Sequence, residues 1–285
     1  MFRWLAGRGA TRREVLRTLA GISASQWQDA VGAYPFLTGL SPEEQQLLHE
    51  HAAWILAGKS FFGAHGFQVS DAVMLSIAVQ AALPVLHLDL VLYEGWTDIV
   101  VYPGGFLVPR SDVDEQTGVV HEYVEELAGE AWEGGPLILS WEDAGPGRDH
   151  AANVVIHEFA HKLDLHAGDV NGMPSLSAHP QLCARDWHRV LHASFDAFQR
   201  AVTQAEDAIP ADVDPESDEA APWLVALPLD PYAASDPGEF FAVSTEAFFI
   251  DPAPLAQAMP DWYGLLAQYF RQDPLGRRAR VSQDT

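Results

Sequence analysis

Cysteine is nearly absent from this sequence, whose 285 residues include only one, Cys183. A single thiol cannot form a disulfide within the chain, so nothing in the sequence requires an oxidising compartment. Nor can it build a metal site from several cysteine ligands. Any bound metal is therefore expected to be held by histidine and carboxylate side chains.

Basic residues are scarce as well. The 16 lysines and arginines stand against 40 aspartates and glutamates, which gives a formal net charge of −24. A chain with this excess of negative charge repels a phosphate backbone, so we expect no nucleic-acid partner. It has no basic stripe that would bind anionic lipid and no apolar run of about 18 residues, so we expect no membrane partner.

The N-terminal segment lacks the long apolar stretch of an export signal. TRREVLRTLAGISA, residues 11–24, resembles a twin-arginine signal. The apolar stretch after Arg17 is short, however, and contains Gly21, whereas a signal needs an apolar region of about 7–15 residues. We therefore predict a basic lead-in over residues 1–38 and a cytoplasmic protein.

Repeats and low-complexity segments are also missing, and apolar residues make up 48% of the chain, enough for a sizeable core. We predict a single α+β domain over 39–276, a C-terminal tail over 277–285, and an acidic, proline-rich exposed loop at 207–222. The fold would be a small mixed sheet packed against the helix at 151–166, with additional helices. Periodicity and capping residues predict helices at 41–63, 70–86, 151–166, 184–206, 236–250 and 260–274, and strands of one sheet at 88–95, 97–108, 119–127 and 135–141.

The segment VVIHEFAHKLDLHAGD, residues 154–169, carries the clearest chemical signal. Residues four apart lie on one face of a helix, so His157 and His161 can point at one metal ion. Glu158 projects beside that face and can reach a water molecule as a general base. Ordinary buried histidines in a packed helix are the alternative interpretation.

Two similar patterns favour structural interpretations. His188 and His192 have the same spacing, but Arg189 stands where the base would be, so we interpret them as the polar face of a helix. HEYVEE, residues 121–126, lies in a predicted strand, where residues four apart do not stack as they do on a helix.

A catalytic zinc site needs a third protein ligand. Asp164 lies too far along the helix to share the ion, but it could accept the remaining N–H of a ligand histidine. His166 and Asp169 fall at or beyond the helix end. Glu239 is the best candidate, because an acid among apolar helix residues needs a partner. Glu246, on the same face seven residues later, is its rival as ligand or as hydrogen-bond acceptor for a histidine.

HEFAHKLD, together with DPYAASDPGEFFAVSTEAFF, IVVYPGGF and GPLILSW, resembles the Mlc titration factor A family of bacterial zinc metallopeptidases. The resemblance implies a zincin-like fold similar to the catalytic domain of anthrax lethal factor, with zinc as the cofactor. It implies Glu239 as the third ligand and Tyr232 beside the metal, where its hydroxyl could donate to an oxyanion. It further implies aminopeptidase-type activity and, for the founding member, binding of the glucose repressor Mlc. The long acidic loop at 207–222 departs from the family pattern.

The sequence thus predicts a zinc metallopeptidase that hydrolyses peptides, with an edge strand such as 119–127 aligning the substrate. The alternative is a regulatory protein on a zincin scaffold, with a structural or vestigial metal, that binds a repressor of the Mlc type. Another zinc hydrolase chemistry, such as ester hydrolysis, is a third possibility.

Overall fold

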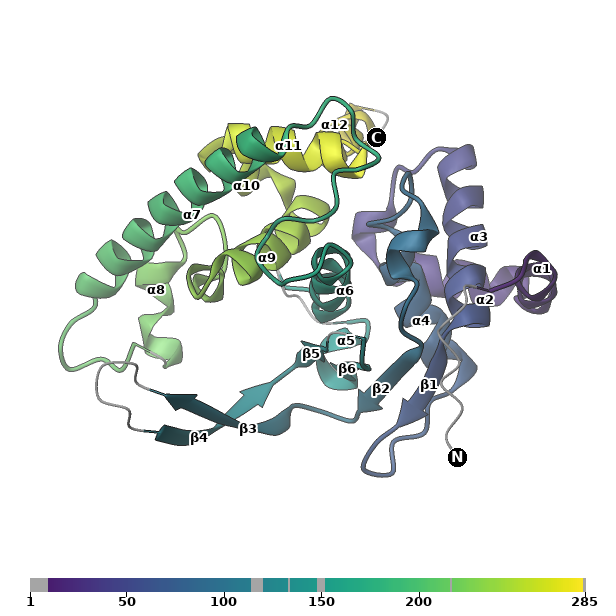
Figure 1. The fold of residues 1–285 in the computed structure, drawn as a ribbon, viewed down its shortest axis with the longest axis horizontal. Helices are drawn as coiled ribbons and strands as arrows, with labels where there is room; N and C mark the ends of the chain where they lie inside the picture. The colour runs from purple at the N-terminus through teal and green to yellow at the C-terminus, as the bar shows by residue number, and fades with distance from the viewer. Residues whose placement is uncertain (1–9, 114–119, 133, 148–151, 216, 284–285) are drawn as a thin grey trace.

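The computed structural model describes residues 10–113, 120–132, 134–147, 152–215 and 217–283, and within 107–127 it describes the backbone alone. A small mixed sheet lies along one side of the molecule, and most helices stand on the opposite side (Figure 1). Helix α6 (Val154–Leu165) runs through the middle, between α9 (Pro237–Ile250) and the strands. This places the two histidines of the sequence motif at the centre of the fold.

The central sheet has four strands in the order β1 (Ser60–Gly63), β2 (Asp98–Tyr102), β6 (Leu137–Ser140) and β5 (Gly129–Ala131). The β1–β2 and β2–β6 pairs are parallel, whereas β5 runs antiparallel to β6 and forms one edge. The predicted α+β class with a small mixed sheet is confirmed. Strands β3 (Phe106–Val113) and β4 (Val120–Leu127) pair only with each other among the described residues, as an antiparallel hairpin that extends away from the sheet (Figure 1).

Two strand predictions and one helix prediction need correction. Residues 88–95 contain the 3-10 helix η2 (Leu90–Tyr93), because the Asp89 carboxylate accepts from Val91 N at 3.0 Å and folds the backbone into a turn. The predicted strand 97–108 is divided between β2 and β3 by Pro103 and two glycines. The predicted helix 41–63 ends at Gly58, and its last residues form β1, a strand that the sequence analysis missed. The four predicted strands therefore do not make one sheet.

The other predicted helices are present, but α4 ends at Ala82 and α11 at Phe270, each four residues before its predicted end. Local capping sets several of the helix starts. Ser41 and Glu44 form a capping box at the start of α3, and Asp236 caps α9. The segment 207–222 is largely exposed, as predicted, but its last residues begin α8. The remaining bounds are α1 (Arg12–Gly21), α2 (Ala24–Gly32), η1 (Pro35–Leu37), α3 (Pro42–Gly58), α4 (Asp71–Ala82), α5 (Trp141–Ala144), α7 (Ala184–Asp207), η3 (Asp218–Ala220), α8 (Ala221–Leu224), η4 (Pro231–Ala234), α10 (Pro252–Ala258), α11 (Pro260–Phe270) and α12 (Pro274–Gln283).

Aromatic side chains form much of the core around α9. Phe240 and Phe241 are fully buried, and the indole of Trp187 on α7 lies edge-on to that of Trp262 on α11 at 5.1 Å between ring centroids. Burial of this much apolar surface is the main stabilising contribution to the fold. It also fixes α9 against its neighbours, so that the polar side chains on its remaining face point consistently toward α6.

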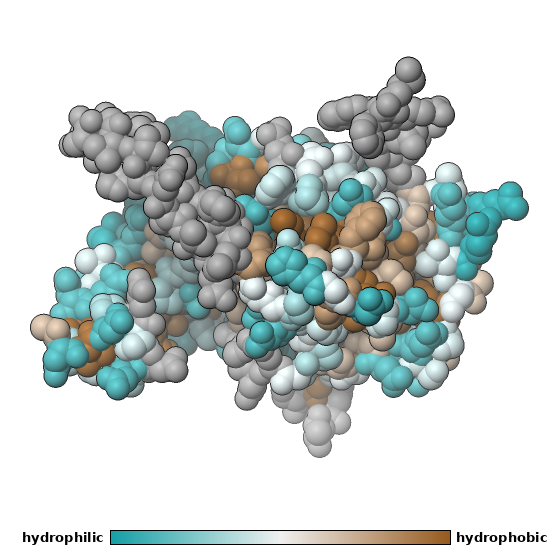
Figure 2. Space-filling model, turned by 90° about the horizontal axis from the view of Figure 1, so that it is seen from below, coloured by the Kyte–Doolittle hydropathy of each residue, from teal (hydrophilic) through white to brown (hydrophobic). Residues whose placement is uncertain are grey.

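The outer side of the sheet is less covered than the inner side. Phe62, Val100 and Ile138 lie in register on adjacent strands, and Phe62 is 51% exposed. Seen from this side, apolar residues gather near the middle of the face and hydrophilic residues surround them (Figure 2). In the described part of the chain, no helix combines the length and apolar character that a membrane crossing requires.

The two ends of the chain are helical where they are described. Helices α1 and α2 lie in the predicted basic lead-in, and α12 covers residues 274–283, with the Arg277 side chain buried. The division into a lead-in, one domain and a tail stays a prediction.

Candidate metal centre

Helix α6 begins at a side-chain cap that points its histidines toward α9. The Asn153 side-chain oxygen accepts from Ile156 N at 2.9 Å and so caps the helix, which starts three residues before His157. Val155, Ile156 and Phe159 are fully buried and hold the helix in the core. His157 and His161 consequently lie one turn apart on the face that meets α9, with their Nε2 atoms 3.0 Å apart.

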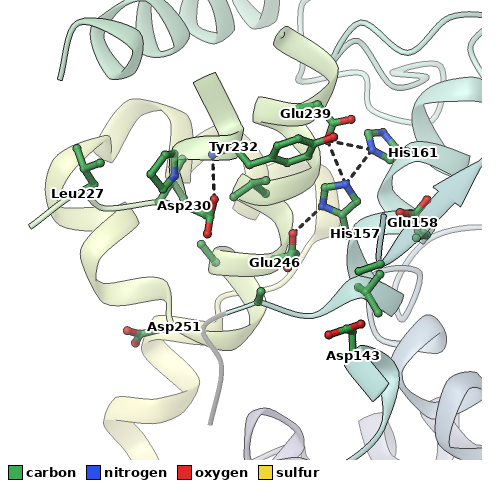
Figure 3. Close-up of a pocket in the computed structure, with 18 of the residues that line it drawn as sticks. Asp143, His157, Glu158, His161, Leu227, Asp230, Tyr232, Glu239, Glu246 and Asp251 are labelled. Carbon is green, nitrogen blue, oxygen red and sulfur yellow. Dashed lines mark hydrogen bonds and ion pairs between the residues drawn. The ribbon is translucent and has the colours of Figure 1, made fainter. Parts of the chain in front are cut away.

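Helix α9 brings Glu239 to the same point. Asp236 caps this helix by accepting from Gly238 N and Glu239 N, so Glu239 lies in its first turn. Its Oε2 atom is 3.1 Å from Nε2 of His157 and 3.3 Å from Nε2 of His161. One ligand atom from each of the three residues lies within 4.8 Å of the others (Figure 3). Two imidazole nitrogens and one carboxylate oxygen form a donor set that could hold a divalent transition metal.

Glu158 lies beside this cluster and outside it. It is 3% exposed, and its Oε2 atom has no hydrogen-bond partner among the described residues. Burial raises the pKa of Glu158 to about 7, against the opposing effect of the two histidines. The side chain packs over Gly129 of β5, where an added Cβ would lie 2.7 Å from Cδ of Glu158. A carboxyl group with a pKa near neutrality can both take up and release a proton.

Glu246 approaches His157 from the side opposite Glu239 (Figure 3). Its Oε1 atom is 2.7 Å from Nδ1 of His157, and its Oε2 atom accepts from the backbone N–H of Asn153. The pKa of His157 is raised well above its ordinary value, because hydrogen bonds to Glu239 and Glu246 outweigh the lowering effect of burial. Glu246 therefore fixes the ring of His157, leaving Nε2 to face Glu239 and His161.

Asp164, the other predicted acceptor, contacts the loop after α6. Its Oδ2 atom accepts from Asn171 N at 2.8 Å and Gly172 N at 2.6 Å. Asp164 Oδ1 and His161 Nδ1 are both buried with no hydrogen-bond partner among the described residues. Its proposed contact with a histidine N–H is thus not formed here, and burial raises the pKa of Asp164 to about 6.

The loop that Asp164 holds packs against the start of α9. A Cβ added at Gly172 would lie 2.6 Å from the Pro237 carbonyl oxygen, and one at Gly238 would lie 3.0 Å from the Val170 carbonyl oxygen. Gly172 also has a φ of +74°, which favours glycine. Asp164 thus connects the end of α6 to the helix that carries Glu239.

Tyr232 projects from the 3-10 helix η4 toward the histidines (Figure 3). Its side chain is 43% exposed, and its ring centroid is 6.2 Å from that of His157. It thus lies at the open side of the cluster, where a phenol could reach a bound molecule.

The cluster opens into a cavity of about 1400 Å³. One wall is the edge strand β5, and the other is formed by the end of α8 and the segment that leads to η4, with apolar side chains including Leu224, Val225 and Leu227. Sequence reasoning missed both walls, because strand order and loop packing join residues far apart in the chain. For the strand at 119–127, the side chains lie outside the described residues, so its role in aligning a substrate stays a prediction.

The remaining candidates do not join the cluster. His166 and Asp169 are exposed beyond the helix. His188 and His192 lie on α7 with ring centroids 4.1 Å apart. Within the described ranges, His157, His161 and Glu239 are the one group of three potential ligands that converges.

Comparison with known proteins agrees with this arrangement. Residues 8–271 match the model of the glucose-regulated metallo-peptidase M90 family. The chain is 35% identical over 262 residues to Mlc titration factor A of Serratia proteamaculans, covering 91% of this chain and 92% of that protein. It is 34% identical to the protein of the same name from Pectobacterium atrosepticum, covering 88% and 87%, and 33% identical to that from Yersinia enterocolitica, covering 100% and 96%. The family implies a metallopeptidase with a metal ion, and this chain belongs to the glucose-regulated metallo-peptidase M90 family.

Proposed function

We propose that this chain is a zinc-dependent peptidase whose metal ligands are His157, His161 and Glu239. The convergence of these three side chains at the floor of a cavity is the observation that carries the proposal, together with the buried Oε2 atom of Glu158 beside them, which has no hydrogen-bond partner in the described part of the chain. Zinc is the metal that two imidazoles and one carboxylate most often hold in peptidases, on a zincin-like scaffold. When bound, zinc supplies Lewis-acid chemistry that polarises a peptide carbonyl and acidifies water.

Glu158 moves the proton in this reaction. Its Oε2 atom, which has no other partner among the described residues, takes a proton from the attacking water and delivers it to the leaving amine. Glu158 lies within one turn of α6 with the proposed ligands His157 and His161, so the carboxyl group that moves the proton stays beside them. Burial between β5 and α6 excludes competing water from this carboxyl group.

Tyr232 and β5 contact the substrate in this proposal. The Tyr232 hydroxyl donates a hydrogen bond to the oxyanion that develops on the scissile carbonyl. The antiparallel edge strand β5 offers backbone groups along one wall of the cavity, so an extended peptide can add to the sheet there. Aminopeptidase-type cleavage, which the family resemblance implies, would place the free amino group of the substrate in this cavity.

Substitution of Glu158 tests the proposal. We expect Glu158→Gln to lower peptide turnover at least about 100-fold while one zinc ion per chain remains bound, because the ligands are untouched. The readouts are hydrolysis of a fluorogenic peptide panel and metal content by mass spectrometry. Glu206→Gln, an exposed acid at the end of α7, serves as the matched control. Cleavage by Glu158→Gln at the parental rate would show that the base is assigned wrongly.

A regulatory role is the second candidate, supported by the name of the relatives, Mlc titration factor A. We propose that the chain also binds a glucose-responsive repressor of the Mlc type, which would place it in the cytoplasm. Pull-down of purified repressor with and without a chelator, beside the peptidase assay, separates the two roles. Binding of the repressor without peptide turnover would favour a regulatory scaffold with a structural metal. Peptide turnover without binding of the repressor would favour a peptidase with no such regulatory role.

A further inference from the structure

A fully buried amide lies behind the metal centre. Gln80, in the last turn of α4, is 0% exposed. Its Nε2 atom donates to Tyr34 Oη at 2.8 Å and lies 3.1 Å from the carbonyl oxygens of Ser76 and Ala144. Its Oε1 atom accepts from Nδ2 of Asn153 at 2.7 Å. Both ends of the Gln80 amide are therefore engaged, which is what a fully buried polar group requires.

Asn153 forms hydrogen bonds to three other residues. Its side-chain oxygen caps α6 by accepting from Ile156 N, so its Nδ2 must point to Gln80. Its backbone N–H donates to Oε2 of Glu246. Since the cap determines which end of the Asn153 amide faces Gln80, the direction of every hydrogen bond in this group is fixed.

Glu246 connects Asn153 to His157. One carboxylate oxygen is held by Asn153 N–H, and the other bonds Nδ1 of His157 at 2.7 Å. A carboxylate fixed at both oxygens cannot rotate away, so the ring of His157 keeps a single orientation. A buried polar chain thus runs from α4 through the cap of α6 and through α9 to a proposed metal ligand.

We propose that Gln80 and Asn153 are positioning residues for the metal centre. They act through Glu246, and they hold Nε2 of His157 toward Glu239 and His161. Without Gln80, the Nδ2 group of Asn153 would be buried and unpaired, which favours rotation of the cap and loosening of Glu246. The inference rests on the proposed function, since it assumes that these three side chains bind metal.

Two variants break the chain and leave the ligands intact. Gln80→Leu removes the acceptor for Asn153 with little change in volume. Asn153→Ser keeps a good helix cap and the backbone N–H, but cannot reach Gln80 as an amide does. We expect each to weaken zinc affinity about tenfold, the lower end of what lost outer partners of metal ligands cost. Chelator competition measures the affinity, and the absorption spectrum of the Co²⁺-substituted protein reports ligand geometry independently of activity.

The control is Gln272→Leu, which removes another buried amide. Gln272 is 6% exposed, donates to Leu83 O at 2.8 Å and accepts from Arg277, with no bond to the chain described above. We expect it to lower thermal stability without changing zinc affinity or the Co²⁺ spectrum. Each substitution removes the same hydrogen bond between Gln80 and Asn153. The double variant should therefore bind zinc no more weakly than the single variant with the lower affinity.

The outcomes separate this inference from the proposed function. If the parental protein binds zinc tightly, and both variants bind it within twofold of the parental affinity with an unchanged Co²⁺ spectrum, Gln80 and Asn153 have a structural role only and the inference is overturned. If the parental protein binds no zinc or cobalt, the proposed function fails before the variants are considered.

Discussion

At the scale of single residues, the catalytic proposal depends on where the Glu158 side chain lies. Gly129 of β5 leaves the space that this side chain occupies, since a Cβ there would overlap its carboxyl group. We expect Gly129→Ala to displace Glu158 and to lower kcat about tenfold or more, while zinc content is unchanged. Steady-state kinetics on a fluorogenic peptide, with metal analysis of the same samples, measure this effect.

Gly264→Ala is the matched control for that substitution. A Cβ at Gly264 on α11 meets nothing within 4 Å, so the same change in composition is sterically free there. Its kcat should equal that of the parental protein. Equal kcat in Gly129→Ala would mean that the Glu158 carboxyl group has another working position.

The sequence predicted the local part of the site and left the non-local part open. Spacing alone placed His157 and His161 on one face of a helix, because that relation lies within one turn. The sequence favoured Glu239 as the third ligand but left Glu246, on the same face of α9, as its rival. The fold separates them, with Glu239 at the Nε2 side of His157 and Glu246 at the Nδ1 side. The contact between Glu158 and Gly129 depends on strand order, so no local pattern reveals it.

At the scale of elements, Lys162 joins the metal-centre helix to the edge of the sheet. The side chain is 3% exposed, and its Nζ atom donates to the carbonyl oxygens of Trp132 at 2.7 Å and Gly135 at 3.0 Å. These carbonyls lie in the turn between β5 and β6. Since β5 is the wall on which we propose a peptide adds, Lys162 positions that wall relative to α6.

Lys162→Met should therefore affect substrate binding more than chemistry. The variant keeps an apolar stem and loses both hydrogen bonds, so β5 becomes less fixed. We expect KM for an extended peptide to rise about tenfold, with kcat and zinc content changed much less. Lys59→Met, which alters another buried lysine away from the β5–β6 turn, should leave KM unchanged. A rise in KM that is equal in both variants would refute a specific role of the turn.

The same scale shows which elements the sequence could and could not specify. Helix α9, which has a side-chain cap and aromatic faces, was placed to within a residue, because its signals are local. Strand β1 was missed because its apolar residues directly follow the apolar end of α3, and a short apolar strand and a helix end look alike in sequence. The segment at 88–95 is rich in apolar residues and bounded by turn residues like a strand, but Tyr93 is buried and donates to Ala81 O, which holds the segment as a turn.

At the scale of the whole molecule, two of the few basic residues lie inside an acidic protein. Lys59 is 7% exposed and donates to the Tyr93 and Trp96 carbonyl oxygens. Its Nζ atom lies 3.4 Å from the centroid of the Trp96 ring, and that of Lys162 lies 4.7 Å from it. Burial, and then the charge of Lys162, lower the pKa of Lys59 to about 7. Burial likewise lowers the pKa of Lys162 to about 8.

These lowered pKa values make stability depend on pH in a definite direction. Between pH 7 and pH 9 the unfolded chain keeps Lys59 protonated, with an ordinary pKa of 10.5, whereas the folded chain loses that proton. The free energy of unfolding should therefore rise with pH in this window, by up to about 1.4 kcal/mol per pH unit for one such group. In Lys59→Met this contribution is gone, whereas that of Lys162, whose pKa is lowered by its own burial, remains. The slope should thus fall by about half, as measured by urea unfolding at pH 7, 8 and 9. Equal slopes in the two proteins would show that Lys59 stays charged in the folded state, stabilised by the carbonyls and the Trp96 ring.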